Sequence, residues 1–153
     1  LVVNVQGDEP LINGSDILAV VEGKCTTPQY VLNGMCAISN PRDIDSPNVL
    51  KVVLNERGEL AYMSRAPIPY VRDKTGVWRY YRQVCIYAFD RNQLQAFAEY
   101  GHKSVLEEPE DIEILRFIDL GIPVRMVEVS ESSVAVDVPE DIERVERLLE
   151  ARR

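Results

Sequence analysis

Two aspartates of the chain, Asp8 and Asp137, each follow a short apolar run and precede a turn. Asp8 stands in NVQGDEP after the apolar residues 1–3, and Asp137 follows residues 134–136. If both runs are strands of one parallel sheet, their carboxyl ends share an edge, where two carboxylates repel each other unless a cation joins them. Mg²⁺ favours one or two carboxylates together with substrate phosphates and water. The pair therefore indicates a magnesium site, and the alternative is that Asp8 orders a turn while Asp137 assists the following helix.

Cationic and acidic side chains elsewhere could bind a charged or hydroxylated ligand. Arg65, in YMSRAPIP, stands between an apolar run and a rigid proline segment, and its guanidinium suits bidentate capture of a carboxylate or phosphate. The segment at 106–113, LEEPEDIE, is rich in carboxylates. It is typical of a solvated helix start, but one or two of these groups could instead accept hydrogen bonds from sugar hydroxyls.

The composition bounds the class of protein. With 153 residues, of which 46% are hydrophobic, the chain can form one domain with a real core. The net charge of −8 argues against a nucleic-acid partner, because nucleic-acid-binding modules usually carry a basic face. No stretch approaches the ~20 apolar residues that cross a bilayer, so we expect no membrane segment. Cys25, Cys36 and Cys85 form no Cys-x-x-Cys pair, which favours reduced thiols and a cytoplasmic location.

Strand and helix patterns alternate along the chain, which is typical of an α/β fold with a mostly parallel sheet. Apolar runs predict strands over residues 1–5, 35–39, 84–89, 124–129 and 134–136. A β-hairpin excursion is predicted over 49–54 and 60–64, because Gly58 between them can adopt a positive φ. Capping residues and apolar spacing predict helices over 16–22, 90–100, 110–120 and from 139 onward.

Six segments, in their order along the chain, resemble the 3-deoxy-manno-octulosonate (Kdo) cytidylyltransferases, or CMP-Kdo synthetases: NVQGDEP, SPNVLKVVLN, YMSRAPIPY, RQVCIYAF, SVLEEPEDIEILR and AVDVPEDIERV. The resemblance implies a Rossmann-like nucleotidyltransferase fold, with residues 1–153 as a single cytidylyltransferase domain. It covers roughly the C-terminal two-thirds of such an enzyme, so the first strands and the triphosphate-gripping loop would be missing. The chain also opens inside an apolar run without an initiating Met, and we expect that it is N-terminally truncated.

The activity that this resemblance implies is transfer of CMP from CTP to a 2-keto-3-deoxy sugar acid, with Kdo the first choice. Pyrophosphate is released, and the product serves lipopolysaccharide or capsule synthesis. Asp8 and Asp137 match the family's magnesium-binding aspartates, so Mg²⁺ is the implied cofactor. A homodimer is also implied, and we expect it to form through residues 49–70. Without the triphosphate loop, the fragment alone should be inactive.

The same resemblance implies a sugar-acid pocket lined by Gln6, Arg65, Tyr87 and Glu107, with Glu110 as a further candidate. Arg65 would pair with the sugar carboxylate, and Gln6 and Glu107 would bind hydroxyls. Gln83 stands where the best-known enzymes of the family carry a histidine. An amide still hydrogen-bonds a hydroxyl but cannot become cationic.

These departures leave the exact sugar open. Val138 replaces the family's helix-capping threonine, a group worth about 1 kcal/mol, and SSVAV replaces a glycine-rich turn. An amino-substituted Kdo or another ulosonic acid is an alternative substrate, and an acylneuraminate cytidylyltransferase is an alternative enzyme. An alternative of another class is a non-catalytic domain for nucleotide or sugar binding, or for dimerisation.

Overall fold

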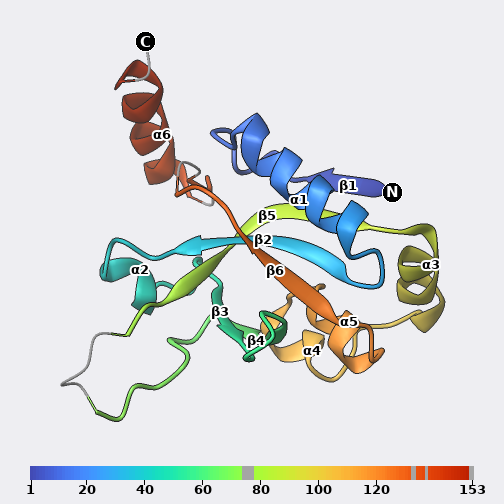
Figure 1. Cartoon of the computed structure of the whole chain (residues 1–153). Coiled ribbons are helices and arrows are strands. Elements are labelled where there is room, and N and C mark those ends of the chain that lie inside the picture. The colour runs from blue at the N-terminus through green and yellow to red at the C-terminus, as the bar shows by residue number, and fades with distance from the viewer. Residues whose placement is uncertain (74–77, 132–133, 137, 152–153) are drawn as a thin grey trace.

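The structure is a computed structural model that describes residues 1–73, 78–131, 134–136 and 138–151. Its elements form one mixed sheet with helices on both faces (Figure 1). In chain order they are β1 (Val2–Val5), α1 (Gly14–Thr26), β2 (Val31–Ala37), α2 (Arg42–Asp45), β3 (Lys51–Leu54), β4 (Leu60–Ser64), β5 (Tyr81–Phe89), α3 (Arg91–Tyr100), α4 (Glu107–Glu110), α5 (Leu115–Asp119), β6 (Val124–Glu128) and α6 (Pro139–Ala151). The α/β class is therefore confirmed. None of the described helices combines the length and apolarity that a membrane crossing requires.

The long strand β5 lies at the centre of the sheet, whose order is β4-β3-β5-β2-β6, with β1 also paired to β5. β2 pairs along most of β5 and so occupies one of its edges. On the other edge, β1 meets the end of β5, where Val5 lies opposite Ile86, and β3 meets its beginning, where Lys51 lies opposite Arg82. On this edge, the middle of β5 therefore lies between its pairing with β3 and its pairing with β1.

The prediction of a mostly parallel sheet is wrong. Among the described strands, β2 and β6 run parallel, whereas β1, β2 and β3 are each antiparallel to β5, and β3 is antiparallel to β4. An apolar run identifies a buried strand but not its direction. The β3–β4 hairpin is confirmed, with Gly58 in its turn at a φ of 74°.

Other boundaries differ where local signals were incomplete. The helix predicted over 110–120 is divided into α4 and α5 at Asp111, which has a left-handed φ of 54°. Residues 134–136 belong to no strand, although the amide of Val136 donates to the carbonyl oxygen of Asp8 at 2.8 Å. α3 begins as predicted, because Asp90 and Gln93 form a capping box.

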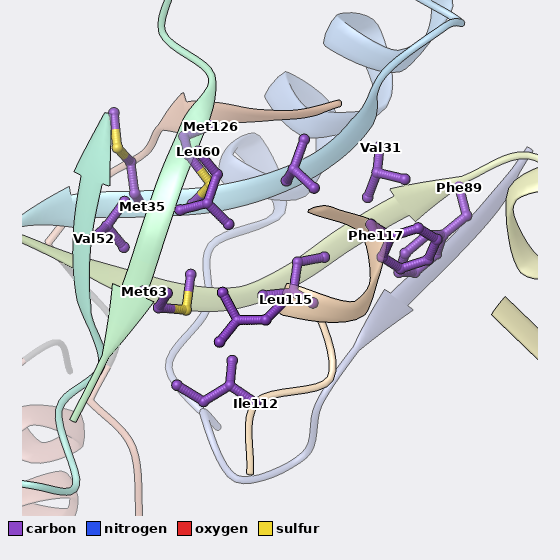
Figure 2. Packing of buried hydrophobic residues seen from close by; sticks show 12 residues of the cluster. Val31, Met35, Val52, Leu60, Met63, Phe89, Ile112, Leu115, Phe117 and Met126 are labelled. Atoms are coloured by element: carbon purple, nitrogen blue, oxygen red, sulfur yellow. The ribbon is translucent and has the colours of Figure 1, made fainter. Parts of the chain in front are cut away.

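The core lies on both faces of the sheet, as the alternation of side chains along a strand requires. One cluster packs α5 and the segment before it against the sheet face to which β4 contributes Met63, and Met63, Ile112, Leu115 and Phe117 gather there (Figure 2). The other cluster packs Val20 of α1 against the opposite face. The helix α6 extends away from the sheet (Figure 1). Of its apolar residues Ile142, Val145, Leu148 and Leu149, only Val145 is buried.

Candidate functional site

A cavity of about 560 Å³ lies beside the middle of β5, at the edge that β1 and β3 leave open. This volume is in the range of small-molecule sites. The predicted site residues that line it are Gln6, Asp8, Arg65, Gln83 and Tyr87. Phe89, Phe97 and Phe117 form part of its apolar wall. The cavity therefore combines polar and charged groups with an apolar wall, as ligand pockets do.

The polar loop after β1 is fastened to β5 by its backbone and by Glu9. The amide of Gln6 donates to the carbonyl oxygen of Cys85 at 3.1 Å, and the amide of Cys85 donates to Glu9 Oε1 at 2.7 Å. The amide of Gln83 donates to the carbonyl oxygen of Leu50 at 3.0 Å, so the loop before β3 is fastened to β5 two residues before Cys85. Both sides of the cavity mouth are thereby held on one strand.

Glu9 also lines the cavity, although the sequence alone provided no reason to assign it a role. The residue is 3% exposed, and its Oε2 atom accepts no hydrogen bond within the described parts of the chain. Arg82 Nη1 lies 3.9 Å from this oxygen and also lines the cavity. The sequence shows Glu9 as the second acidic residue of GDEP, but it does not show that this residue is buried.

Arg65 is held at the wall by backbone oxygens. Its Nε donates to the carbonyl oxygen of Glu110 at 2.9 Å, and its Nη1 donates to that of Pro47 at 3.1 Å. The carboxylate of Glu110 accepts from the amide of Arg65 at 2.9 Å and from the hydroxyl of Ser64. Glu110 is thus placed behind Arg65 and outside the cavity lining, where it orients the segment that carries the guanidinium.

Lys51 supports the same wall from inside the core and was missed by the sequence analysis. It is fully buried, and its ammonium donates at 2.6 Å to the carbonyl oxygens of Ser46 and Val49 and also to that of Arg65. Burial lowers the pKa of Lys51, and the charges of Asp45 and Glu110 oppose that change. One side chain therefore ties the loop before β3 to the end of β4.

Glu107 lies outside the cavity lining, in contrast to the predicted pocket contact. Its carboxylate, 1% exposed, accepts from Arg116 Nε and Nη2, each at 2.6 Å, and from the amide of Ser104 at 3.1 Å. The Arg116 guanidinium holds the pKa of Glu107 below its usual value. Both carboxylate oxygens are engaged, so Glu107 joins α4 to α5 within the fold.

Asp8 is exposed and lines the cavity, which suits a group that must meet a hydrated cation. Asp137 lies outside the described residues. Val134 and Ala135 on one side of it, and Asp141 and Arg144 in α6 on the other, line the same cavity. No group of three or more metal-ligating side chains occurs in the described ranges. A magnesium site made of one or two carboxylates, substrate phosphate and water does not require such a group. The carboxylate of Asp8 is therefore a suitable donor for Mg²⁺.

Gln83 and Tyr87 lie on the same face of β5 and touch through their polar ends. Gln83 Nε2 donates to Tyr87 Oη at 2.9 Å and to Asn33 Oδ1 at 3.0 Å. Burial raises the pKa of Tyr87 well above its usual value, so the phenol remains protonated. The cavity wall here is polar but uncharged.

Comparisons with known proteins bear on what this cavity holds. Residues 1–127 match the family model described as cytidylyltransferase. The chain is 39% identical over 152 residues to the 3-deoxy-manno-octulosonate cytidylyltransferase of Solibacter usitatus (strain Ellin6076), covering 99% of the chain and 60% of that protein. It is 35% identical over 147 residues to the enzyme of the same name from Escherichia coli, covering 96% of the chain and 59% of that protein. The chain thus spans about 60% of the length of these curated relatives.

Solved structures agree with this result. A structure of CMP:2-keto-3-deoxy-manno-octonic acid synthetase complexed with CTP superposes with a TM-score of 0.88 at 35% identity, covering 99% of this chain and 62% of that one. A putative glucose-1-phosphate thymidylyltransferase from Bacillus anthracis superposes with a TM-score of 0.61 at 14% identity, covering 95% and 53%. The second likeness concerns the fold alone and supports a nucleotidyltransferase-like architecture.

Proposed function

The chain belongs to the cytidylyltransferase family, and from this premise we propose that the full-length protein transfers CMP from CTP to a 2-keto-3-deoxy sugar acid, with Kdo the first choice. The observation that carries the proposal is the cavity beside β5, which gathers Gln6, Asp8, Arg65, Gln83 and Tyr87. The relatives named as Kdo cytidylyltransferases support the choice of sugar.

The proposed reaction exchanges one phosphorus–oxygen bond for another. The anomeric hydroxyl oxygen of the sugar acid bonds to the α-phosphorus of CTP, and the bond from that phosphorus to the oxygen bridging to the β-phosphorus breaks. Pyrophosphate leaves with the electron pair, and the hydroxyl proton passes to solvent. The two reactants must be held in line for this displacement, and that positioning is the main contribution of the side chains in the cavity.

Arg65 would bind the carboxylate of the sugar acid. A guanidinium held by the carbonyl oxygens of Glu110 and Pro47 keeps its orientation before the ligand arrives, which reduces the entropy lost on binding. The charge–charge pairing would also keep the sugar carboxylate away from the phosphates of CTP. Gln6, at the mouth of the cavity, would bind a sugar hydroxyl.

Asp8 and Asp137 are the proposed ligands of Mg²⁺. The hydrogen bond from the amide of Val136 to the carbonyl oxygen of Asp8 supports this pairing, because it joins the segment before position 137 to the loop that carries Asp8. When bound, Mg²⁺ would supply neutralisation of charge on the α-phosphate. Asp8, which lines the cavity and is exposed, would contribute its carboxylate to the ion.

The protein is further proposed to act in the cytoplasm as a homodimer formed through residues 49–70. The exposed Tyr70, at 82%, supports an apolar contact there. Light scattering on the full-length protein tests the assembly, and a monodisperse monomer would contradict it.

The activity is tested by pyrophosphate release from the full-length protein with CTP, Mg²⁺ and a panel of sugar acids. We expect release that requires both CTP and a 2-keto-3-deoxy sugar acid, fastest with Kdo, and a lower rate with N-acetylneuraminate. A neutral sugar without a carboxylate serves as the control and should give no release. Release that does not depend on the sugar, or none with any sugar acid, would contradict the proposal.

A further inference from the structure

Asn33 is a fully buried amide within the apolar strand β2, and it does not line the cavity. Its Nδ2 donates two hydrogen bonds of 3.0 Å, to the carbonyl oxygens of Val84 and Ile86 in β5. Its Oδ1 accepts from Gln83 Nε2 at 3.0 Å. Both N–H groups of the Asn33 amide therefore donate to β5, the strand that carries Gln83 and Tyr87.

These contacts determine which way both amides face. A backbone carbonyl oxygen can only accept, so the two carbonyl oxygens require the NH₂ group of Asn33 on their side. Asn33 Oδ1 then faces Gln83, and an oxygen there requires the NH₂ group of Gln83. The second hydrogen of that group is donated to Tyr87 Oη at 2.9 Å. The orientation of Gln83 is thus set by two carbonyl groups that lie beyond Asn33.

The consequence is a defined pair of groups at the cavity wall. Gln83 Oε1 accepts no hydrogen bond from any residue that the structure describes, and Gln83 lines the cavity, so this oxygen is available to a ligand as an acceptor. Tyr87 Oη already accepts from Gln83, so its own proton must be donated elsewhere. Among the described residues, the thiol of Cys85 also interacts with the Tyr87 hydroxyl, and a thiol is a weak partner that a ligand oxygen can replace.

We propose that Asn33 is a positioning residue that presents Gln83 Oε1 and the Tyr87 hydroxyl as an acceptor and a donor for a single hydroxyl of the sugar acid. This inference rests on the proposed function and adds a rule of substrate choice to it. A hydroxyl satisfies both groups, because it donates and accepts at once. An ammonium can only donate and a carboxylate can only accept, so each leaves one member of the pair without a partner in a wall where Gln83 is buried. An amino-substituted sugar acid is therefore disfavoured at this position.

The test measures KM and kcat for the sugar acid and for CTP in the full-length protein, by pyrophosphate release, with the variants Asn33→Ala, Gln83→Met and both together. We expect Asn33→Ala to raise the KM of the sugar acid about tenfold and to leave the KM of CTP unchanged, because Gln83 loses the partner that orients it. In the Gln83→Met background the same change should alter this KM by less than about twofold.

A second arm identifies the hydroxyl with Kdo analogues in which one hydroxyl at a time is replaced by hydrogen or by an amino group. At one position the wild-type protein should lose at least about tenfold in kcat/KM, and Gln83→Met should lose that discrimination. The matched control is Gln93→Ala, which removes another buried and hydrogen-bonded amide that is not part of the cavity lining. It should lower the midpoint of thermal unfolding without changing the KM of the sugar acid.

The outcomes separate the two proposals. If Asn33→Ala lowers thermal stability but leaves the KM of the sugar acid unchanged, or if its effect multiplies fully with that of Gln83→Met, Asn33 is structural and the inference is overturned. It is also overturned if every analogue is discriminated equally by the wild type and by Gln83→Met. If the wild type releases no pyrophosphate with any sugar acid, the proposed function fails, and the inference fails with it.

Discussion

The amide of Val136 donates to the carbonyl oxygen of Asp8 at 2.8 Å, and this bond joins the loop after β1 to the segment that leads into α6. These two segments lie near opposite ends of the chain but border the same cavity. Their contact supports the proposal that a cation is shared by Asp8 and Asp137.

Replacing Asp8 by Ala in the full-length protein is expected to lower kcat for pyrophosphate release at least about 100-fold, because a group that stabilises charge at the transferred phosphate is lost. The KM of Mg²⁺ should rise in parallel. Glu108→Ala, which removes an exposed carboxylate outside the cavity lining, is the matched control and should leave both constants unchanged. Normal turnover of the Asp8 variant would contradict the proposed metal site.

Replacing Arg65 by Lys is expected to raise the KM of the sugar acid more than about tenfold while the KM of CTP stays constant. An ammonium cannot donate in two parallel directions to a carboxylate, nor can it keep both contacts with Glu110 and Pro47. Arg79→Lys, at an exposed arginine paired with Glu128, is the control. Equal effects of the two substitutions would argue against a carboxylate contact at Arg65.

Replacing Lys51 by Met should destabilise the chain by about 3 kcal/mol, because the partly buried carbonyl oxygens of Ser46, Val49 and Arg65 lose a charged donor. Urea denaturation at pH 7 measures the free energy of unfolding. Lys103→Met removes an exposed ion pair with Asp111 and should cause no measurable loss. An unchanged stability of the Lys51 variant would mean that water replaces the ammonium in the wall.

Replacing Glu107 by Gln should cost about 3 kcal/mol at pH 7, because the partly buried guanidinium of Arg116 is left without its counter-charge. The pKa of Glu107 is lower in the folded state than in the unfolded chain. Its stabilising contribution is therefore fully present above the unfolded value of about 4.3 and is lost as the pH falls through the folded pKa. Urea midpoints measured at pH 7 and at several values below pH 4 should show the difference between the wild type and the variant shrinking as the pH falls. Parallel curves would exclude the ion pair as the source of the difference.

The three cysteines should react with iodoacetamide in a fixed order. Cys25 is exposed, whereas burial raises the pKa of Cys36 to about 11 and raises that of Cys85 further. Since the thiolate is the reactive form, Cys25 should be alkylated first at pH 8, and the other two only slowly. Mass spectrometry of digested protein measures the order, and unfolding in urea should equalise the three rates. Rapid alkylation of Cys85 in the folded chain would show that its side of the cavity is more open than the structure indicates.

Much of the fold could be predicted from the sequence, because it depends on residues close together in the chain. Gly58 supplied the positive φ that the β3–β4 hairpin needs, and Asp90 supplied the cap of α3. Both are satisfied by contacts within a few residues. Arg65 was indicated by its chemistry and its place before a proline segment, whereas Gln6, Gln83 and Tyr87 came from the resemblance to a known family. The structure gathers all four at one cavity.

What only the tertiary structure decided involves contacts and backbone conformations that no local sequence pattern indicates. The direction of β5, the break of the predicted helix at Asp111, the pairing of Glu107 with Arg116 and the burial of Asn33 leave no local pattern. An Asn in an apolar strand has the same sequence signal whether its amide meets water or two carbonyl groups of a neighbouring strand. The energy of a buried polar group depends on the partner that the fold brings to it, so its role is determined only when the sheet is assembled.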